Sequence, residues 1–323
     1  MPLLDRYLLH QLHRKRSRDS QYAYDFMSPI SVDIAGLQAN YATPEVPHIH
    51  WTRSDERGNY EWGRYAFDSE ISSGHRNNDV ASGRYYAGRT KEAKEHVIFV
   101  HGWRMDGLDR IKELFLPGFM NRGADMYFFT LPYHFERSPE EALYGGEYMV
   151  SANIDRTLLA VKQAVSDLRA LIRWIKERKG GRVILIGISL GGFVTNLTGV
   201  IEERIDLLIS VMYANRLAYS VWKTIPGKYI REDLERHGFT YEQLESCWAI
   251  TDPSRFEPVI PKDRILLLSG RYDRYVLEED AARLWESWDK PKRIVYASGH
   301  AGIVLKRRQI AEDVLSFVSS RLS

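Results

Sequence analysis

Ser189 stands where a hydroxyl group can act as a nucleophile. The apolar, mostly β-branched run at 182–188 predicts a buried parallel strand, and residues 190–200 can continue as a helix. Glycines two residues before and after Ser189, at 187 and 191, lack the Cβ atoms that would collide with backbone in a sharp turn. The turn would expose the hydroxyl at the carboxyl edge of a sheet. The structural alternative is a glycine-rich helix start with an ordinary serine.

Two residues downstream could activate that hydroxyl. Asp273 follows the apolar run 264–270, and His300 follows the run 293–296, both of which predict strands. The carboxyl ends of parallel strands meet at one edge of a sheet, so both side chains would lie beside Ser189. His300 could then take the hydroxyl proton, while Asp273 would fix the imidazole tautomer and stabilise the imidazolium. The predicted triad is therefore Ser189, Asp273 and His300.

A fourth segment could stabilise negative charge on a substrate oxygen. The run 96–100 predicts a buried strand that ends in His101-Gly102-Trp103. The backbone amide of Trp103, after the turn at Gly102, and that of Leu190, after the nucleophile, would form the oxyanion hole. The His101 side chain is predicted to be structural, because it precedes the glycine and has no acid of its own downstream.

These four separated elements together resemble the α/β-hydrolase superfamily, over approximately residues 80–323. The resemblance implies an α/β-hydrolase fold: a mostly parallel central sheet with helices on both faces and a small helical cap insertion. It also implies a serine hydrolase that works without a cofactor or metal.

A narrower resemblance depends on about sixty residues. Leu131–Pro139, Gly145–Glu147, a long helix from about Asn153 and Leu190–Gly192 resemble the alpha/beta hydrolase domain-containing protein eighteen family and its bacterial relatives. That branch implies an ester or acyl hydrolase without a firm substrate.

The rest of the chain predicts three regions. Alternating apolar and aromatic residues at 51–89 predict antiparallel edge strands, and strands and helices then alternate, with a long helix at 154–177. The alternation breaks at 214–261. We therefore expect an N-terminal helix and arm at 1–50, a core domain at 51–213 and 262–323, and a cap or lid at 214–261.

Three residues are candidates for binding substrate. Trp222 and Trp248 lie in the predicted cap, where they could line an apolar pocket or pack against the core. His134 follows the predicted strand 125–130 and is expected to line the pocket or, as a rival to His300, to act as the base. Glu136 and Arg137 beside it could hold a polar substrate group or pair with each other.

Composition indicates a soluble enzyme. The 323 residues are 44% hydrophobic and 27% charged, and a net charge of +2 gives no indication of nucleic-acid binding. The single cysteine, Cys247, cannot form an intrachain disulfide, which favours the cytoplasm. No metal cluster or transmembrane run is visible. A basic amphipathic helix at Leu3–Arg16 could lie on a membrane surface, but packing on its own domain or on a partner subunit is the stronger expectation. The oligomeric state stays open.

These observations predict a serine esterase that cleaves a carboxylic ester through an acyl-enzyme intermediate. The same machinery could act on a thioester, lactone, amide or lipid acyl group, or transfer the acyl group to an alcohol. A catalytically silent hydrolase-fold protein that binds a partner is the alternative from a different class.

Overall fold

A 9-stranded sheet forms the centre of the computed structural model, which describes residues 31–57, 60–88, 92–105 and 107–322. The strand order is β1-β2-β3-β5-β4-β6-β7-β8-β9. Strands β1, β2, β3 and β5 pair antiparallel, and all pairs from β5 to β9 are parallel. The strands are β1 His50–Arg57, β2 Tyr60–Asp68, β3 Val80–Gly88, β4 Glu95–Val100, β5 Asp125–Phe129, β6 Arg182–Ile188, β7 Leu207–Val211, β8 Ile265–Gly270 and β9 Lys292–Tyr296.

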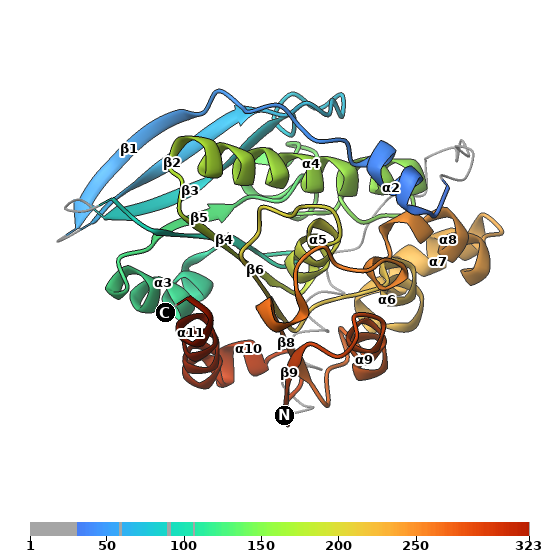
Figure 1. The fold of residues 1–323 in the computed structure, drawn as a ribbon. Helices are drawn as coiled ribbons and strands as arrows, with labels where there is room; N and C mark the ends of the chain where they lie inside the picture. The colour runs from blue at the N-terminus through green and yellow to red at the C-terminus, as the bar shows by residue number, and fades with distance from the viewer. Residues whose placement is uncertain (1–30, 58–59, 89–91, 106, 323) are drawn as a thin grey trace.

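Helices cover both faces of this sheet (Figure 1). Helices α4, α5 and α9 pack on one face, and α3 and α11 pack on the other. The α-helices are α2 Ile34–Asn40, α3 Asp109–Asn121, α4 Ile154–Arg178, α5 Leu190–Gly199, α6 Leu217–Lys223, α7 Lys228–Arg236, α8 Tyr241–Cys247, α9 Glu278–Ser287, α10 Gly302–Leu305 and α11 Arg307–Leu322. Short 3-10 turns are η2 Phe135–Arg137, η3 Ile225–Gly227, η4 Ala249–Thr251, η5 Pro253–Arg255 and η6 Lys262–Arg264.

Strand β6 shows why a nearly continuous apolar run forms a central strand. Val183 and Leu185 point into the core layer under α4 and α5, whereas Ile184, Ile186 and Ile188 point into the layer under α3 and α11. A strand with helices on both sides buries alternate side chains in two different cores, so every buried position of β6 is apolar, and only the first residue, Arg182, is exposed. The predicted α/β-hydrolase architecture, with a mostly parallel sheet between two helical layers, is therefore confirmed.

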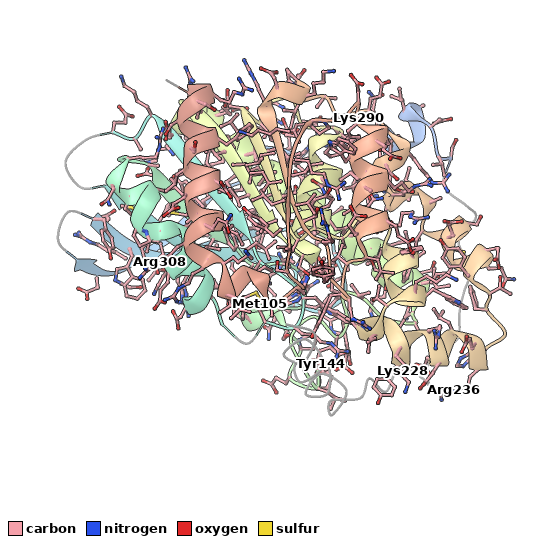
Figure 2. All side chains as sticks on the ribbon, turned by 90° about the horizontal axis from the view of Figure 1, so that it is seen from below. Met105, Tyr144, Lys228, Arg236, Lys290 and Arg308 are labelled. Carbon is pink, nitrogen blue, oxygen red and sulfur yellow. The ribbon has the colours of Figure 1, made fainter. Side chains whose placement is uncertain are left out.

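The functional loops and the predicted cap lie at one end of the sheet. Figure 2 shows Met105, which follows β4, at the same end as Tyr144 and as Lys228 and Arg236 of α7, whereas Lys290, which precedes β9, lies at the other end. The segment 214–261, where the alternation of strands and helices breaks, contains α6, α7 and α8. The predicted helix at Leu3–Arg16 lies outside the described residues. Within the described ranges, every helix is too short or too polar to cross a bilayer.

Candidate active site

Ser189 occupies a strained turn between β6 and α5. Its backbone φ is 55° and its ψ is −117°, in a region that non-glycine residues rarely adopt and that costs on the order of 1–3 kcal/mol. Backbone hydrogen bonds over-determine the turn, because Ser189 N donates to Val211 O at 3.0 Å and Ala214 N donates to Ser189 O at 3.2 Å. Strain held in this way is typical of a position selected for function.

The two glycines of the motif make this turn possible. A Cβ atom at Gly187 would lie 2.3 Å from Thr195 Oγ1, and one at Gly191 would lie 2.2 Å from Val100 O. Both distances are far below van der Waals contact, so a side chain at either position would push α5 away from β4 and β6. The sequence argument for these glycines therefore matches the packing of the turn.

Asp273 and His300 come together in the loops after β8 and β9. His300 Nδ1 donates to Asp273 Oδ2 at 2.7 Å, and the Asp273 side chain is almost fully buried. The other carboxylate oxygen, Oδ1, accepts from the backbone amides of Tyr275 at 2.8 Å and Val276 at 3.0 Å. Three donors fix the carboxylate, and the Nδ1–H donation leaves Nε2 of His300 as the ring nitrogen that can receive a proton.

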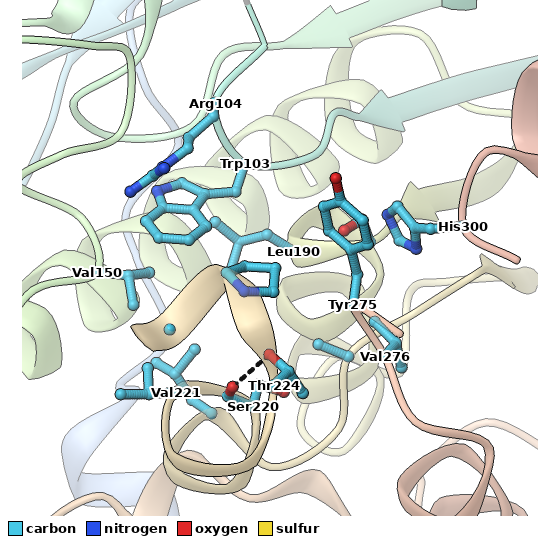
Figure 3. Close-up of a pocket in the computed structure, with 15 residues that line it drawn as sticks. Trp103, Arg104, Val150, Leu190, Ser220, Val221, Thr224, Tyr275, Val276 and His300 are labelled. Carbon is cyan, nitrogen blue, oxygen red and sulfur yellow. Dashed lines mark hydrogen bonds between the residues drawn. The ribbon is translucent and has the colours of Figure 1, made fainter. Parts of the chain in front are cut away.

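Ser189 and His300 line one cavity of about 140 Å³, together with both predicted oxyanion residues, Trp103 and Leu190 (Figure 3). Leu190 is the first residue of α5, so its amide lies at the positive end of that helix. Gly102 brings the β4 loop close to the nucleophile, since a Cβ there would lie 3.2 Å from Ser189 Cβ. The loop that carries Trp103 therefore passes directly beside Ser189.

The walls of this cavity are mainly apolar. Short turns of the 214–261 segment supply one wall through α6 and η3, and the Thr224 hydroxyl there donates to Ser220 O at 2.6 Å (Figure 3). The apolar lining residues are Val150, Leu190, Ala214, Leu217, Val221, Pro226 and Val276. A mainly apolar cavity beside a serine hydroxyl suits the hydrocarbon part of a small ester.

His101 and His134 are buried behind the cavity. His101 Nδ1 donates to Gly102 O at 2.8 Å and its Nε2 accepts from Leu131 N at 3.1 Å, while His134 Nδ1 donates to Pro132 O at 2.8 Å. Burial lowers the pKa of His101 to about 4 and that of His134 well below the usual range. Both rings are thus held neutral, and they organise the loops rather than face substrate.

The three predicted substrate-binding residues do not join the Ser189 cavity. His134 has no exposed surface, because its ring packs against Gly146 and the ring of His101. Trp248 is buried, with its indole Nε1 donating to Ile154 O at 3.3 Å, and Trp222 packs against Tyr241 with ring centroids 6.2 Å apart. The segment 214–261 therefore contributes aliphatic residues to the cavity, whereas its two tryptophans contact protein instead.

Glu136 and Arg137 differ from the expectation that they pair with each other or hold substrate. Arg137 is fully buried and its Nη2 donates to Asp167 Oδ2 at 2.8 Å, whereas Glu136 Oε1 accepts from the Ser82 hydroxyl at 2.9 Å. Adjacent residues in a 3-10 turn point in different directions, so their side chains reach separate partners.

Tyr275 and Arg104 are among the cavity residues that the sequence analysis missed. Tyr275 stacks on His300, and Arg104 lies with its guanidinium 4.3 Å from the Trp103 ring centroid and 4.0 Å from that of Tyr144. Tyr275 lies two residues after the predicted acid, and Arg104 follows the predicted oxyanion residue, so adjacency to those residues was the available signal. The stacking itself is a tertiary contact that no local pattern encodes.

The chain is similar to uncharacterized proteins from two organisms. The chain is 54% identical over 115 residues to the uncharacterized protein YdjC of Bacillus subtilis (strain 168), which covers 36% of this chain and 99% of that protein. It is 28% identical over 237 residues to the uncharacterized protein Rv2627c of Mycobacterium tuberculosis, which covers 71% of this chain but only 55% of that protein. The chain thus matches about half the length of its mycobacterial relative.

Solved structures share the fold at low identity. An acetyl xylan esterase from Paenibacillus sp. R4 is 13% identical with a TM-score of 0.69 and covers 97% of this chain and 99% of its own. A cold-adapted esterase from an Arctic intertidal metagenomic library is 14% identical with a TM-score of 0.57, covering 84% and 99%. The model of the alpha/beta hydrolase family matches residues 97–312, more than half of the sequence. The chain belongs to the alpha/beta hydrolase family.

Proposed function

We propose that this protein is a serine esterase that cleaves small carboxylic esters through a Ser189–His300–Asp273 triad. The observation that carries the proposal is the hydrogen bond from His300 Nδ1 to Asp273 Oδ2, in a pair that opens on the same cavity as a strained serine. A hydrogen-bonded acid and base beside a serine held at positive φ is the arrangement that nucleophilic acyl transfer requires.

Each residue then has a defined step. His300 Nε2 takes the proton of the Ser189 hydroxyl as the serine oxygen attacks the substrate carbonyl carbon, and the carbonyl oxygen becomes an oxyanion. The amides of Leu190 and Trp103 donate to that oxyanion, each worth about 3 kcal/mol by analogy with a removed donor elsewhere. His300 next protonates the leaving alcohol. Water, activated by the same ring, attacks the acyl-enzyme and releases the acid.

Cavity size supports a short acyl or alcohol group. The volume of about 140 Å³ is close to the roughly 150 Å³ of an apolar cavity that binds benzene. A hydrocarbon of about six carbons is therefore near the upper limit. Two structural neighbours are acetyl xylan esterases, a name that refers to a small acyl group and is compatible with this proposal. We also propose 214–261 as the cap and the cytoplasm as the location, the latter because the chain has a single cysteine.

The experiment is a matched substrate panel. Purified protein and the Ser189→Ala variant are assayed on p-nitrophenyl butyrate, the butyryl thioester and the butyryl anilide. We expect turnover of the oxygen ester above that of the other two, and its loss in the variant. Preference for the thioester or the anilide would show that the enzyme cleaves a thioester or amide bond instead of an oxygen ester. Equal activity of both proteins on the ester would refute the triad, and absence of turnover on all three would favour a silent binding protein.

A further inference from the structure

The face of β1–β3 that points away from α4 contains two adjoining hollows. Their volumes are about 240 and about 370 Å³, and Arg64 and Glu136 line both. Arg84 lines the smaller hollow, and Arg76 lines the larger one. We call this surface, defined by Arg64, Arg76, Arg84 and Glu136, the β1–β3 groove. The opposite face of the same strands is core, where Tyr65, Phe67 and Tyr85 pack beneath α4.

Two arginines of the groove lie where their positive charges repel each other. Arg64 of β2 is directly opposite Arg84 of β3 in the antiparallel register, so both side chains project from the same face. Like charges directly opposite one another destabilise a sheet. Within the described ranges, Arg64, Arg76 and Arg84 have no carboxylate at ion-pair distance. Strands β2 and β3 and the turn between them thus carry three guanidinium groups that contact no counter-ion among the described residues.

Glu136 is the acidic residue among the described residues that line the hollows, and other groups orient it. Its Oε1 accepts from the hydroxyls of Ser82 at 2.9 Å and Thr130 at 3.4 Å. It therefore offsets one positive charge at the boundary of the two hollows. Among the described residues that line the two hollows, three guanidinium groups and one carboxylate sum to a net charge of +2.

Protection of the sheet edge does not account for these arginines. Charged side chains on an edge strand prevent pairing with other chains. The edge strand here is β1, whereas Arg64 and Arg84 lie on β2 and β3, which are paired on both sides. A hollow surface with opposed, unneutralised arginines on interior strands instead has the features of an anion site.

We propose that the β1–β3 groove binds a phosphate monoester or inorganic phosphate, that is, a dianionic phosphoryl group. A phosphate monoester carries about −1.5 to −2 charge at neutral pH, which matches the net charge of the groove. The planar fork of arginine donates two parallel hydrogen bonds to phosphoryl oxygens. A bound phosphoryl group between Arg64 and Arg84 would replace their repulsion with attraction, and the larger hollow beside Arg76 leaves room for the rest of an ester.

The groove is separate from the Ser189 cavity but shares a loop with it. Trp103 and Arg104 line the cavity, and Gly107 and Leu108 of the same loop line the smaller hollow. None of the arginines of the groove lines the cavity. The proposal therefore stands independently of the esterase chemistry, and loss of one activity does not imply loss of the other.

The test is calorimetric titration of the full chain with inorganic phosphate and with glycerol 2-phosphate, and with glutarate as a dicarboxylate of equal charge. Arg64→Thr and Arg84→Thr keep a strand-forming residue and remove one cation each. Arg308→Thr, on the exposed surface of α11, is the matched charge control. We expect both phosphates to bind, with Kd raised about tenfold or more by either groove variant and unchanged by the control.

A second readout separates ligand binding from a structural role. Without phosphate, the Tm of Arg64→Thr and Arg84→Thr should equal or exceed that of the parent, because the like-charge pair is removed. Phosphate should raise the Tm of the parent and of Arg308→Thr more than that of the groove variants. Absence of phosphate binding at millimolar concentration, equal Kd in all variants, or tighter binding of glutarate than of phosphate would overturn the proposal.

Discussion

The phenol ring of Tyr275 lies flat against the imidazole ring of His300, with ring centroids 4.7 Å apart and planes 12° apart. The backbone amide of Tyr275 also donates to Asp273 Oδ1 at 2.8 Å. One residue thus contacts both the proposed base and the acid that orients it. Because an aromatic face attracts a cation, the stack should favour the imidazolium that forms when Ser189 is deprotonated.

Replacing Tyr275 tests that role. Tyr275→Phe keeps the ring and should retain most activity, whereas Tyr275→Leu should lower kcat about tenfold with a smaller change in KM, in line with a contact worth up to about 2 kcal/mol. Loss of the stack makes imidazolium less stable, so the midpoint of the acidic limb of kcat/KM should move to lower pH in Tyr275→Leu. Identical pH profiles for the two variants would show that the ring does not position or stabilise His300.

Substitutions of His300 and of His134 should have different effects on activity and stability. His300→Ala should abolish acylation, and Asp273→Asn should lower kcat by about 10⁴ through loss of the correct tautomer. His134 is fully buried and outside the Ser189 cavity, so His134→Ala should lower the free energy of unfolding by about 1–3 kcal/mol and leave kcat within about tenfold. Initial rates and urea denaturation of each variant provide the measurement. An inactive, stable His134→Ala would reverse the assignment.

Stability should fall as the solution is acidified below the histidine range. Burial lowers the pKa of His96 and of His101 to about 4, and it lowers the pKa of His134 well below its usual range. The unfolded chain binds these protons near pH 6.5 and the folded protein does not, so stability is lost as pH falls from about 6.5 toward 4. Burial also raises the pKa of Asp125 and Asp280, which opposes this loss over the lower part of that window.

The His96→Leu variant isolates one contribution. Without this titration, the free energy of unfolding should depend less steeply on pH between 6.5 and 4. The total change over that range should shrink by up to about 1.4 kcal/mol for each unit by which the pKa of His96 differs between the folded and unfolded chains. Urea unfolding at several pH values gives the slope. Equal slopes for parent and variant would mean that His96 titrates alike in the folded and unfolded chains.

The sequence predicted those parts of the fold in which the same residues determine both the local element and its packing against the rest of the protein. The apolar run of β6 with its flanking glycines predicts both a strand and a strained serine, because the same residues produce the turn and the packing around it. The antiparallel strands β1–β3 and the helix Ile154–Arg178 likewise follow from periodicity. The narrower resemblance to the alpha/beta hydrolase domain-containing protein eighteen family stays a prediction.

The residues of the cavity wall were less predictable. The aromatic residues of 214–261 suggested a lining, but Trp222 and Trp248 gain more by burying their rings against protein. Val221 and Pro226 reach the cavity because α6 and η3 turn beside Leu190, which depends on how distant segments pack. Amino-acid type alone favours the large aromatic side chains for a binding role, and tertiary placement decides otherwise.

Acyl-chain preference tests the cavity. Across p-nitrophenyl esters, kcat/KM should rise with each methylene buried, because each one should strengthen transition-state binding by about 0.8 kcal/mol. The value of kcat/KM should fall once the acyl chain exceeds about six carbons. Val221→Ala removes side-chain volume from the wall and so enlarges the cavity, which should shift the preferred acyl length toward longer chains. Val304→Ala, at an exposed position of α10 away from the cavity, is the control and should keep the parent profile. A flat profile in all three proteins would mean that this cavity does not hold the acyl chain.

Covalent labelling by a fluorophosphonate probe tests the central claim most directly, because the reagent reacts with an activated serine. Ser220 lines the same cavity and supplies an internal control. Intact mass and peptide mapping should show one adduct per chain, on Ser189, in the parent and in Ser220→Ala, and none in Ser189→Ala, whose kcat on esters should fall by up to about a millionfold. An adduct on Ser220, or ester hydrolysis by Ser189→Ala within about tenfold of the parent, would contradict the account.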